Sequence, residues 1–126
     1  MTQPLPPYAD VLGLSLTEDG ALRMPFADSI VGRPGFVHGG AISGLLELAA
    51  FRAVHAALAD PAIRIKPINI TVDFMRGGRP RDTFAIGHVA RLGTRIANVE
   101  ATAWQEDRDT PIATARINLL LKRPRV

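Results

Sequence analysis

The hydrophobic positions form one almost unbroken apolar segment near the middle of the chain and alternating segments after it. Residues 40–59 are rich in alanine and leucine, both good helix formers, and are apolar nearly all round. This pattern predicts a helix of roughly 20 residues, about 30 Å long, that other elements cover on most sides. Asp60 precedes Pro61. Because the residue before a proline disfavours helical geometry, we expect the helix to end there.

The second half of the chain alternates apolar and polar residues, as half-buried strands do. The alternating apolar positions of the first segment are Ile68, Ile70, Val72 and Phe74, and the later extended segments are residues 83–92, 96–105 and 112–121. Short turns separate these segments, so we predict an antiparallel meander of four strands over residues 67–121. One sheet and one very apolar helix predict an α+β fold, with an antiparallel β-sheet wrapped around a long central α-helix.

The first part of the chain carries weaker patterns. Residues 1–10 hold three prolines and are predicted to be irregular or a short docking segment. Residues 11–16 alternate weakly, which predicts a short strand or a turn. A turn at residues 18–20 and a second strand at 21–26 would complete a hairpin. Residues 27–37 are predicted to be a loop.

Length and composition fit a single small globular domain. The chain has 126 residues, of which 47% are hydrophobic and 21% charged, and this size can bury a core without cross-links. We therefore predict one domain over residues 1–126, with residues 1–19 as an N-terminal segment. Cysteine is absent, which excludes disulfides, thiol catalysis and cysteine-based metal sites. Three histidines give little support for a metal site, and none is predicted.

Arginine carries nearly all of the positive charge. Fifteen basic residues face twelve acidic ones, for a net charge of +3, and only Lys66 and Lys122 are lysines. Arginine suits paired hydrogen bonds to phosphate or carboxylate, so a phosphate-bearing small molecule is a fitting ligand. The only tight basic cluster, Lys122, Arg123 and Arg125, is interpreted as a solvated end. No nucleic-acid partner is predicted.

The sequence shows no pattern typical of secretion or of a membrane span. The N-terminus lacks a basic region followed by an apolar run, so no secretory signal is expected. Residues 39–58 are apolar enough to be mistaken for a span, but they contain Glu47, Arg52 and His55. Charges at the middle of a span are costly in lipid. We expect a soluble cytoplasmic protein without a membrane partner.

Two features of candidate chemistry coincide on the predicted helix. His38-Gly39-Gly40 stands at its start, where backbone N–H groups lack partners within the helix and could stabilise an oxyanion. Glu47 lies two turns further on, and desolvation there would favour its work as a base or nucleophile. Each feature alone has an ordinary interpretation, since glycine pairs often precede helices and a helical glutamate often reaches solvent or an arginine. Their coincidence favours a catalytic site.

This pattern, His-Gly-Gly with an acid nine residues after the histidine, resembles the hotdog-fold acyl-CoA thioesterases. It is most similar to the PaaI-like branch, which contains phenylacetyl-CoA and 4-hydroxybenzoyl-CoA thioesterases. The resemblance covers about residues 20–121 and implies a hotdog fold. A sheet around one helix leaves an edge uncovered, so we also expect a homodimer that extends the sheet. Pairing of dimers into a homotetramer is a further expectation.

The resemblance implies roles for three residues at the helix. Glu47 would attack the thioester carbonyl or activate the water that does so, and the sequence leaves both routes open. The Gly39 amide would hydrogen-bond the thioester oxygen. His38 would orient the loop or touch the substrate. No cofactor is needed beyond water.

Further residues are assigned to substrate or CoA binding. Arg76 and the turn Gly93-Thr94-Arg95 match positions where relatives hold the nucleotide and pantetheine of CoA, and arginine suits its phosphates. Phe51 and Phe74 would form walls on the acyl side of the pocket. The other residues assigned to the pocket are Gly40, Ser43 and Asn69.

The sequence departs from the family pattern at two places. Gly32 stands where many relatives have an asparagine, and Ala50 and Phe51 stand where many have a threonine or serine. Ser43, Asn69 or Asp73, or a group of the partner chain, could supply the missing polar group. His55, on roughly the same helix face as Glu47, is interpreted as a contact at the helix end.

The sequence thus predicts a thioesterase that hydrolyses an aryl, arylacetyl or medium-chain acyl-CoA to the free acid and CoA. Two alternatives remain open at this stage. One is a hotdog hydratase or dehydratase, which would move protons on the acyl chain. The other is a non-catalytic acyl-CoA-binding hotdog protein, which the missing hydroxyl at Ala50 and Phe51 would suit.

Overall fold

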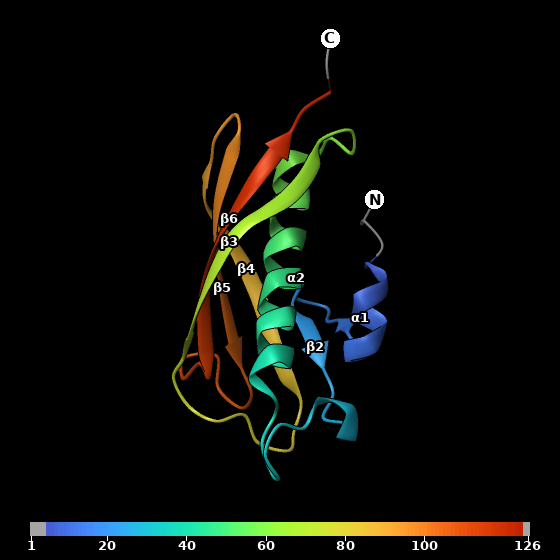
Figure 1. Ribbon diagram of the computed structural model, residues 1–126, viewed down its shortest axis with the longest axis vertical. Helices are drawn as coiled ribbons and strands as arrows, with labels where there is room; N and C mark the ends of the chain where they lie inside the picture. The colour runs from blue at the N-terminus through green and yellow to red at the C-terminus, as the bar shows by residue number, and fades with distance from the viewer. Residues whose placement is uncertain (1–4, 125–126) are drawn as a thin grey trace.

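The computed structural model describes residues 5–124 and shows one curved sheet packed against one long helix. In Figure 1 the helix α2 lies between the sheet and a short N-terminal helix, α1. This is the α+β architecture expected of a hotdog fold. Arg125, the last cation of the basic tail, lies outside the described residues.

The central helix α2 spans Gly39–Leu58, within one residue of the predicted range at each end. His38 caps its start, and Ala59 ends it in the left-handed conformation, with φ of 54°. By length and composition alone α2 could cross a membrane, but half of its most apolar window is buried inside the protein. The sheet packs against α2, as expected for a helix that carries no polar stripe.

The sheet has six strands in the order β1-β2-β4-β5-β6-β3, and all neighbouring pairs are antiparallel. Their bounds are β1 Ser15–Leu16, β2 Leu22–Met24, β3 Arg64–Phe74, β4 Thr83–Leu92, β5 Ile96–Trp104 and β6 Ala113–Lys122. The last three form the predicted meander. The prediction that β3 belongs to it was wrong, because β3 pairs with β6 and β2 takes the place beside β4. Hydrophobic period identifies a strand but does not specify its neighbour.

The N-terminal prediction was also wrong in part. Residues Pro7–Leu12 form the helix α1, where an irregular or short docking segment, followed by a short strand or turn, was expected. Proline is well suited to the first helical position, and Gly13 ends α1 in the left-handed conformation with φ of 69°. Tyr8 and Leu12 of α1 pack where Gly44 of α2 has no side chain. The predicted hairpin is present as the pair β1–β2, with shorter strands.

The apolar residues of β3 are more exposed than the sequence predicted. Ile68, Ile70 and Phe74 are 51%, 38% and 55% exposed. Ile70 and Phe74 point to the α2 side of the sheet, since their partners on β6 are the buried Ile117 and Ala113. However, β3 is an edge strand, and α2 packs mainly on β4 and β5. Among residues 5–124, Val72 of β3 packs against the core, whereas Ile70 and Phe74 on the same face remain exposed.

Small residues let α2 approach the sheet closely. Five alanines of β5 and β6 that face the helix are buried: Ala97, Ala101, Ala103, Ala113 and Ala115. On β4, a side chain at Gly87 would place its Cβ 2.5 Å from the carbonyl oxygen of Ala49 in α2. The backbones of helix and strand therefore pack directly at Gly87.

We expect Gly87→Ala to destabilise the protein by roughly 1–3 kcal/mol, the usual cost of overpacking, because backbone atoms of α2 would have to move away. Denaturant unfolding followed by circular dichroism measures the change. His88→Ala is the matched control, since His88 is the next residue on β4 and its side chain is exposed. We expect the free energy of unfolding of this variant to stay within about 0.5 kcal/mol of the parent protein. Equal stability of Gly87→Ala and the parent would contradict the close packing.

Candidate active site

The start of α2 is anchored by the loops on both sides of it. The Nδ1 atom of His38 accepts a hydrogen bond from the Gly40 amide at 2.8 Å. The His38 amide donates to the Ile30 carbonyl at 2.7 Å, and the Val37 amide donates to the Gly78 carbonyl at 2.9 Å. His38 therefore orients the loop as its helix-capping residue, and its exposed ring remains open to solvent.

The Gly39 amide is an open hydrogen-bond donor. The neighbouring amides are used, since Gly40 donates to His38 Nδ1 and Ala41 donates to the His38 carbonyl at 3.0 Å. Within residues 5–124, the Gly39 amide has no acceptor. It carries part of the positive end of the helix dipole and is suited to hold a carbonyl oxygen or an oxyanion.

A cavity of about 430 Å³ borders Gly39. Phe74 forms one wall, with its Cζ 3.4 Å from the position that a Gly39 Cβ would take. Arg33 and Arg76 also line this cavity. It contains the predicted residues His38, Gly39, Phe74 and Arg76, and we call it the proximal cavity.

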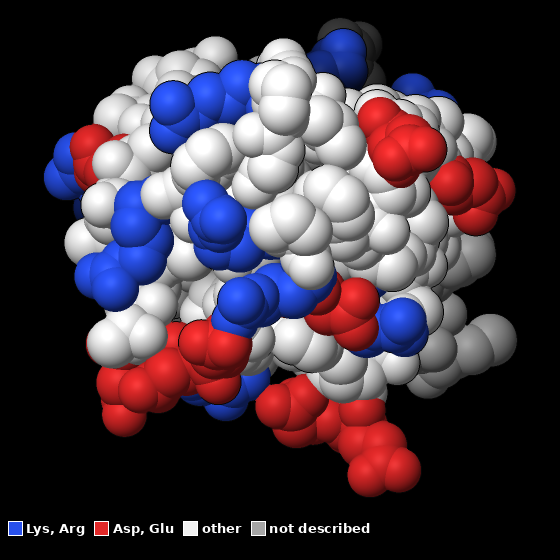
Figure 2. Space-filling model, turned by 90° about the horizontal axis from the view of Figure 1, so that it is seen from below, with Lys and Arg blue, Asp and Glu red and all other residues white. Residues whose placement is uncertain are grey.

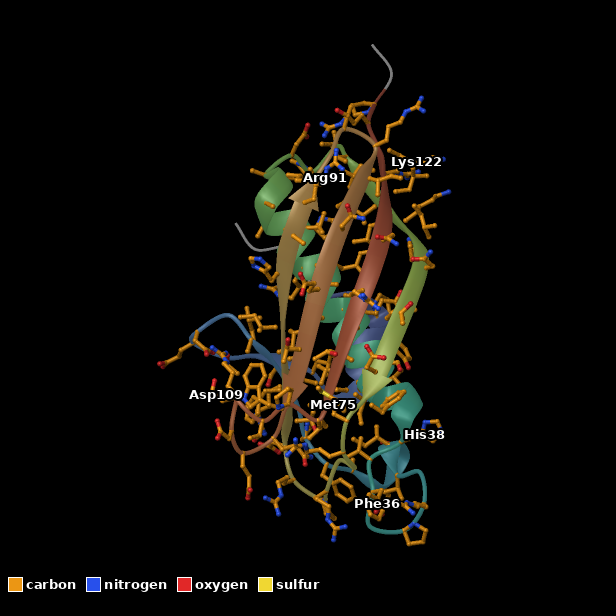
Figure 3. The ribbon with its side chains drawn as sticks, turned by 90° about the vertical axis from the view of Figure 1, so that its left-hand side faces the viewer. Phe36, His38, Met75, Arg91, Asp109 and Lys122 are labelled. Carbon is orange, nitrogen blue, oxygen red and sulfur yellow. The ribbon has the colours of Figure 1, made fainter. Side chains whose placement is uncertain are left out.

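Sequence reasoning missed a basic cluster beside the proximal cavity. The guanidinium groups of Arg33 and Arg79 lie 3.9 and 4.8 Å from the centre of the Phe36 ring. Figure 3 shows Phe36 below His38 at this end of the molecule, and Figure 2 shows several basic side chains close together there. Two loops that are far apart in the sequence meet here, so no local pattern could have revealed the cluster.

Glu47 lies on a half-buried stripe of α2. The stripe consists of four residues at intervals of four, Ser43, Glu47, Phe51 and His55. Residues 44–46, 48–50 and 54 are buried, and residues four apart lie above one another on a helix. Among residues 5–124, Glu47 has no ion pair. We call this line of residues the open stripe.

One chain does not bring Glu47 to the Gly39 amide. The two residues are eight positions apart on α2, which is about 12 Å along the helix axis. A carbonyl bound at the Gly39 amide would sit about 3 Å beyond it. The carboxylate of the same chain cannot reach that carbon.

The remaining residues predicted for the site lie in separate parts of the molecule. Phe51 lines a second cavity of about 260 Å³ with Arg52 and His55, so Phe51 and Phe74 border different cavities. Burial, and then the nearby Arg52, lower the pKa of His55. Asn69 does not join the site, because it accepts a hydrogen bond from Asn118 at 2.8 Å on the sheet face opposite α2.

The turn Gly93-Thr94-Arg95 lies at the end of the sheet opposite Arg76. Arg123 donates from Nε to the Thr94 carbonyl at 2.9 Å, and the Leu121 amide donates to the Arg95 carbonyl at 2.7 Å. Figure 3 labels Arg91 and Lys122 at this end, far from His38. In one chain the two predicted CoA-binding regions are therefore separate.

The family model of the thioesterase superfamily matches residues 34–112. The chain belongs to the thioesterase superfamily. Its matched region contains the capped start of α2, Glu47 and the strands β3, β4 and β5. Membership in this superfamily supports thioesterase activity. No curated protein sequence matches the chain.

Solved structures resemble this member of the thioesterase superfamily over most of its length. A protein of Chromobacterium violaceum is 32% identical, with 94% of this chain and 85% of that chain covered and a TM-score of 0.73. A candidate thioesterase of Ralstonia eutropha, described as related to phenylacetic acid degradation, is 22% identical, with coverage of 94% and 92% and a TM-score of 0.80. A Bacillus halodurans protein crystallised with CoA is 16% identical, with coverage of 90% and 74% and a TM-score of 0.81. The hotdog fold expected from the sequence is thereby confirmed.

The candidate active site contains no cluster suited to a metal. Within residues 5–124, no three His, Asp or Glu side chains lie close enough together to hold an ion.

Proposed function

We propose that this protein hydrolyses acyl-CoA thioesters to the free acid and CoA. The observation that carries the proposal is the open Gly39 amide at the start of α2, beside a cavity, in a chain of the thioesterase superfamily. Aryl, arylacetyl and medium-chain acyl groups are the substrates to test first. The likeness of the fold to the Ralstonia eutropha protein supports the arylacetyl group.

The proposed chemistry uses the two functional groups of α2. The Gly39 amide and the helix dipole polarise the thioester carbonyl and stabilise the negative charge that develops on its oxygen. Glu47 either attacks the carbonyl carbon or takes a proton from the attacking water. The tetrahedral intermediate then expels the CoA thiolate. On the direct route this step leaves a mixed anhydride between the acyl group and Glu47, which water then hydrolyses. In ¹⁸O water under single-turnover conditions, label in the Glu47 carboxylate identifies the direct route with attack of water on the Glu47 carbon, because the general-base route places label only in the free acid.

The proposed active site is shared between two chains. If a two-fold axis passes near Ser43, the two α2 helices run antiparallel and Gly39 of one chain faces Glu47 of its partner, because Ser43 lies midway between them. The long edge of β3 supports this arrangement, since no strand among residues 5–124 pairs with its outer side. Ile68, Ile70 and Phe74 supply an apolar surface beside that edge.

CoA is the proposed carrier of the acyl group. Arg33, Arg76 and Arg79 form no ion pair with any acid of residues 5–124, so their charge is available to phosphate groups. The Bacillus halodurans protein with CoA has the same fold. Antiparallel pairing would also bring the Gly93-Thr94-Arg95 end of one chain toward the Arg76 end of its partner. The two predicted CoA-binding regions would then lie on the same side of the dimer.

The direct test is a thiol-release assay over a panel of acyl-CoA substrates that includes phenylacetyl-, 4-hydroxybenzoyl- and octanoyl-CoA. Hydrolysis of one or more substrates supports the proposal. A parallel absorbance assay follows hydration of enoyl-CoA, the reaction of the alternative hotdog hydratase. CoA binding without thiol release would identify a binding protein instead.

We expect Ile70→Lys to convert the proposed dimer into a monomer and to abolish thiol release, because a charge would face the apolar partner surface. Light scattering after gel filtration measures the molecular mass. Thr71→Lys is the matched control, since it adds the same charge on the opposite face of β3. A monomeric parent protein, or an Ile70→Lys variant that stays dimeric and active, would contradict the shared site.

A further inference from the structure

The second cavity, which we call the distal cavity, combines an apolar lining with two nitrogen-bearing side chains. Its volume is about 260 Å³, and its lining residues are Leu5, Pro6, Leu48, Phe51, Arg52, His55 and Ile65. Apolar side chains line most of it, and Arg52 and His55 are the lining residues whose side chains carry N–H donors. A mostly apolar pocket with a few convergent polar groups is the usual form of a small-molecule site.

The distal cavity continues from Glu47 along the open stripe. Phe51 and His55 are four and eight residues after Glu47, or about 6 and 12 Å along the helix axis. In the proposed function the acyl carbonyl lies at the Glu47 carboxylate of one chain and the CoA arm leaves toward the partner's helix start. The acyl group then points along the open stripe of the chain that supplies Glu47, into its distal cavity.

Arg52 lacks a counterion in this setting. The ion pairs among residues 5–124 use Arg23, Arg81 and Arg108. On its other side, Arg52 lines a different cavity together with Asp19. The Asp19 carboxylate already pairs with Arg108 at 3.0 Å. A half-buried guanidinium without an acidic partner gains most from a carboxylate, which it binds with two parallel hydrogen bonds.

His55 adds a second donor without adding charge. Its ring is half-buried, and burial together with Arg52 lowers its pKa. The neutral imidazole therefore dominates at pH 7 and offers one N–H group beside Arg52. Among the side chains of residues 5–124, no other titratable group lines the distal cavity. The cavity thus presents one positive charge in an otherwise apolar lining.

We infer that the distal cavity receives the far end of the acyl group, and that Arg52 makes the enzyme prefer acyl groups ending in a carboxylate. The substrate class is the CoA monothioester of a short dicarboxylic acid. This inference rests on the proposed thioesterase function. Phe51 and Leu48 would contact the methylene chain, and Arg52 would bind the terminal carboxylate with His55 beside it.

The experiment compares adipyl-CoA with hexanoyl-CoA, which have the same number of carbons and differ only at the far end. We expect kcat/KM of the parent protein to be at least about tenfold higher for adipyl-CoA, the usual gain from a hydrogen-bonded charge pair. Arg52→Met keeps the length and helix propensity of the side chain but removes its charge. It should reverse the preference, because the carboxylate would then enter an apolar cavity without a partner.

Two further variants make the result specific. Arg52→Lys keeps the charge without the paired geometry, so it should retain part of the preference. Arg64→Met removes an exposed cation that does not line the cavity, and it should leave the preference unchanged. Hydrolysis of hexanoyl-CoA by every variant would show that the reaction itself is intact.

The outcomes separate this inference from the function on which it rests. If the parent protein hydrolyses hexanoyl-CoA but shows no preference for adipyl-CoA, or if Arg52→Met leaves the ratio unchanged, the inference is overturned and the thioesterase function stands. If no thioester is hydrolysed, the function fails. Calorimetric binding of the two CoA esters to the parent and to Arg52→Met then decides the inference alone, and equal affinities would refute it.

Discussion

Replacing Glu47 with glutamine is expected to lower kcat for acyl-CoA hydrolysis by about 10³-fold, the usual range for a lost general base. The amide has nearly the same shape as the carboxylate, so it fills the same half-buried place on the open stripe. It cannot attack a carbonyl carbon or accept a proton from water. Initial rates of thiol release, measured with the best substrate of the panel, give the ratio.

The change should act on turnover and leave binding and folding nearly intact. KM should change little, because the Gly39 amide and the arginines near the proximal cavity remain in place. Glu100→Gln removes a carboxylate from the exposed face of β5 and should keep the parent rate. If the Glu47→Gln protein keeps the parent rate, the Glu47 carboxylate has no role in the mechanism.

Replacing Gly39 with proline is expected to lower kcat by about 10²–10³-fold, as the loss of one oxyanion donor does in other enzymes. Proline removes the N–H group that the mechanism needs and adds a ring beside Phe74. It is favoured at the first helical position, which Gly39 occupies. His38 already has the extended geometry that a residue before proline adopts, with φ of −63° and ψ of 135°.

Gly39→Ala is the control that separates the amide from the space around it. Alanine keeps the N–H group, and its Cβ would lie 3.4 Å from Phe74 Cζ, a contact that a small movement of the ring relieves. We expect Gly39→Ala to retain most of the turnover. If Gly39→Ala and Gly39→Pro lose activity equally, crowding at Phe74 and not the amide explains the effect.

The two inactive variants together test the shared site. In a mixed dimer of Glu47→Gln and Gly39→Pro chains, one site has both groups and the other has neither. Random pairing makes half of all dimers mixed, so coexpression should restore about a quarter of the parent activity. Coexpressed variants that stay inactive would place both groups in one chain, against the 12 Å axial separation estimated from about 1.5 Å per helical residue.

The sequence predicted those elements whose pattern is local. The apolar run of α2 and the alternating residues of β4, β5 and β6 are strong periodic patterns, and their bounds were close. The neighbour of β3 was not predictable in this way, because pairing with β6 depends on contacts between distant segments. Residues 1–10, with their three prolines, were predicted to be irregular or a short docking segment, although Pro7 starts the helix α1.

The candidate site was predictable to the same extent. The positions of His38, Gly39 and Glu47 at the start and along one helix followed from residue spacing and family resemblance, whereas the capping role of His38 was not predicted. The cluster of Arg33, Phe36 and Arg79 was not foreseen, because it forms where two loops meet in space. That Arg52 has no ion pair among residues 5–124 was not predictable either, because it depends on which acids the fold brings near this side chain.

The two outer strands of the sheet differ greatly in length, and this difference limits how far chains can assemble. At one end of the sheet β1 has only two residues, whereas at the other end β3 has eleven. Joining two chains through β3 pairs their two long edge strands with each other. The two β1 strands, of two residues each, then remain as the edges of the joined sheet. Such short borders offer few backbone groups to another chain. Assembly through strand addition would therefore stop at a pair and would not continue into a fibre.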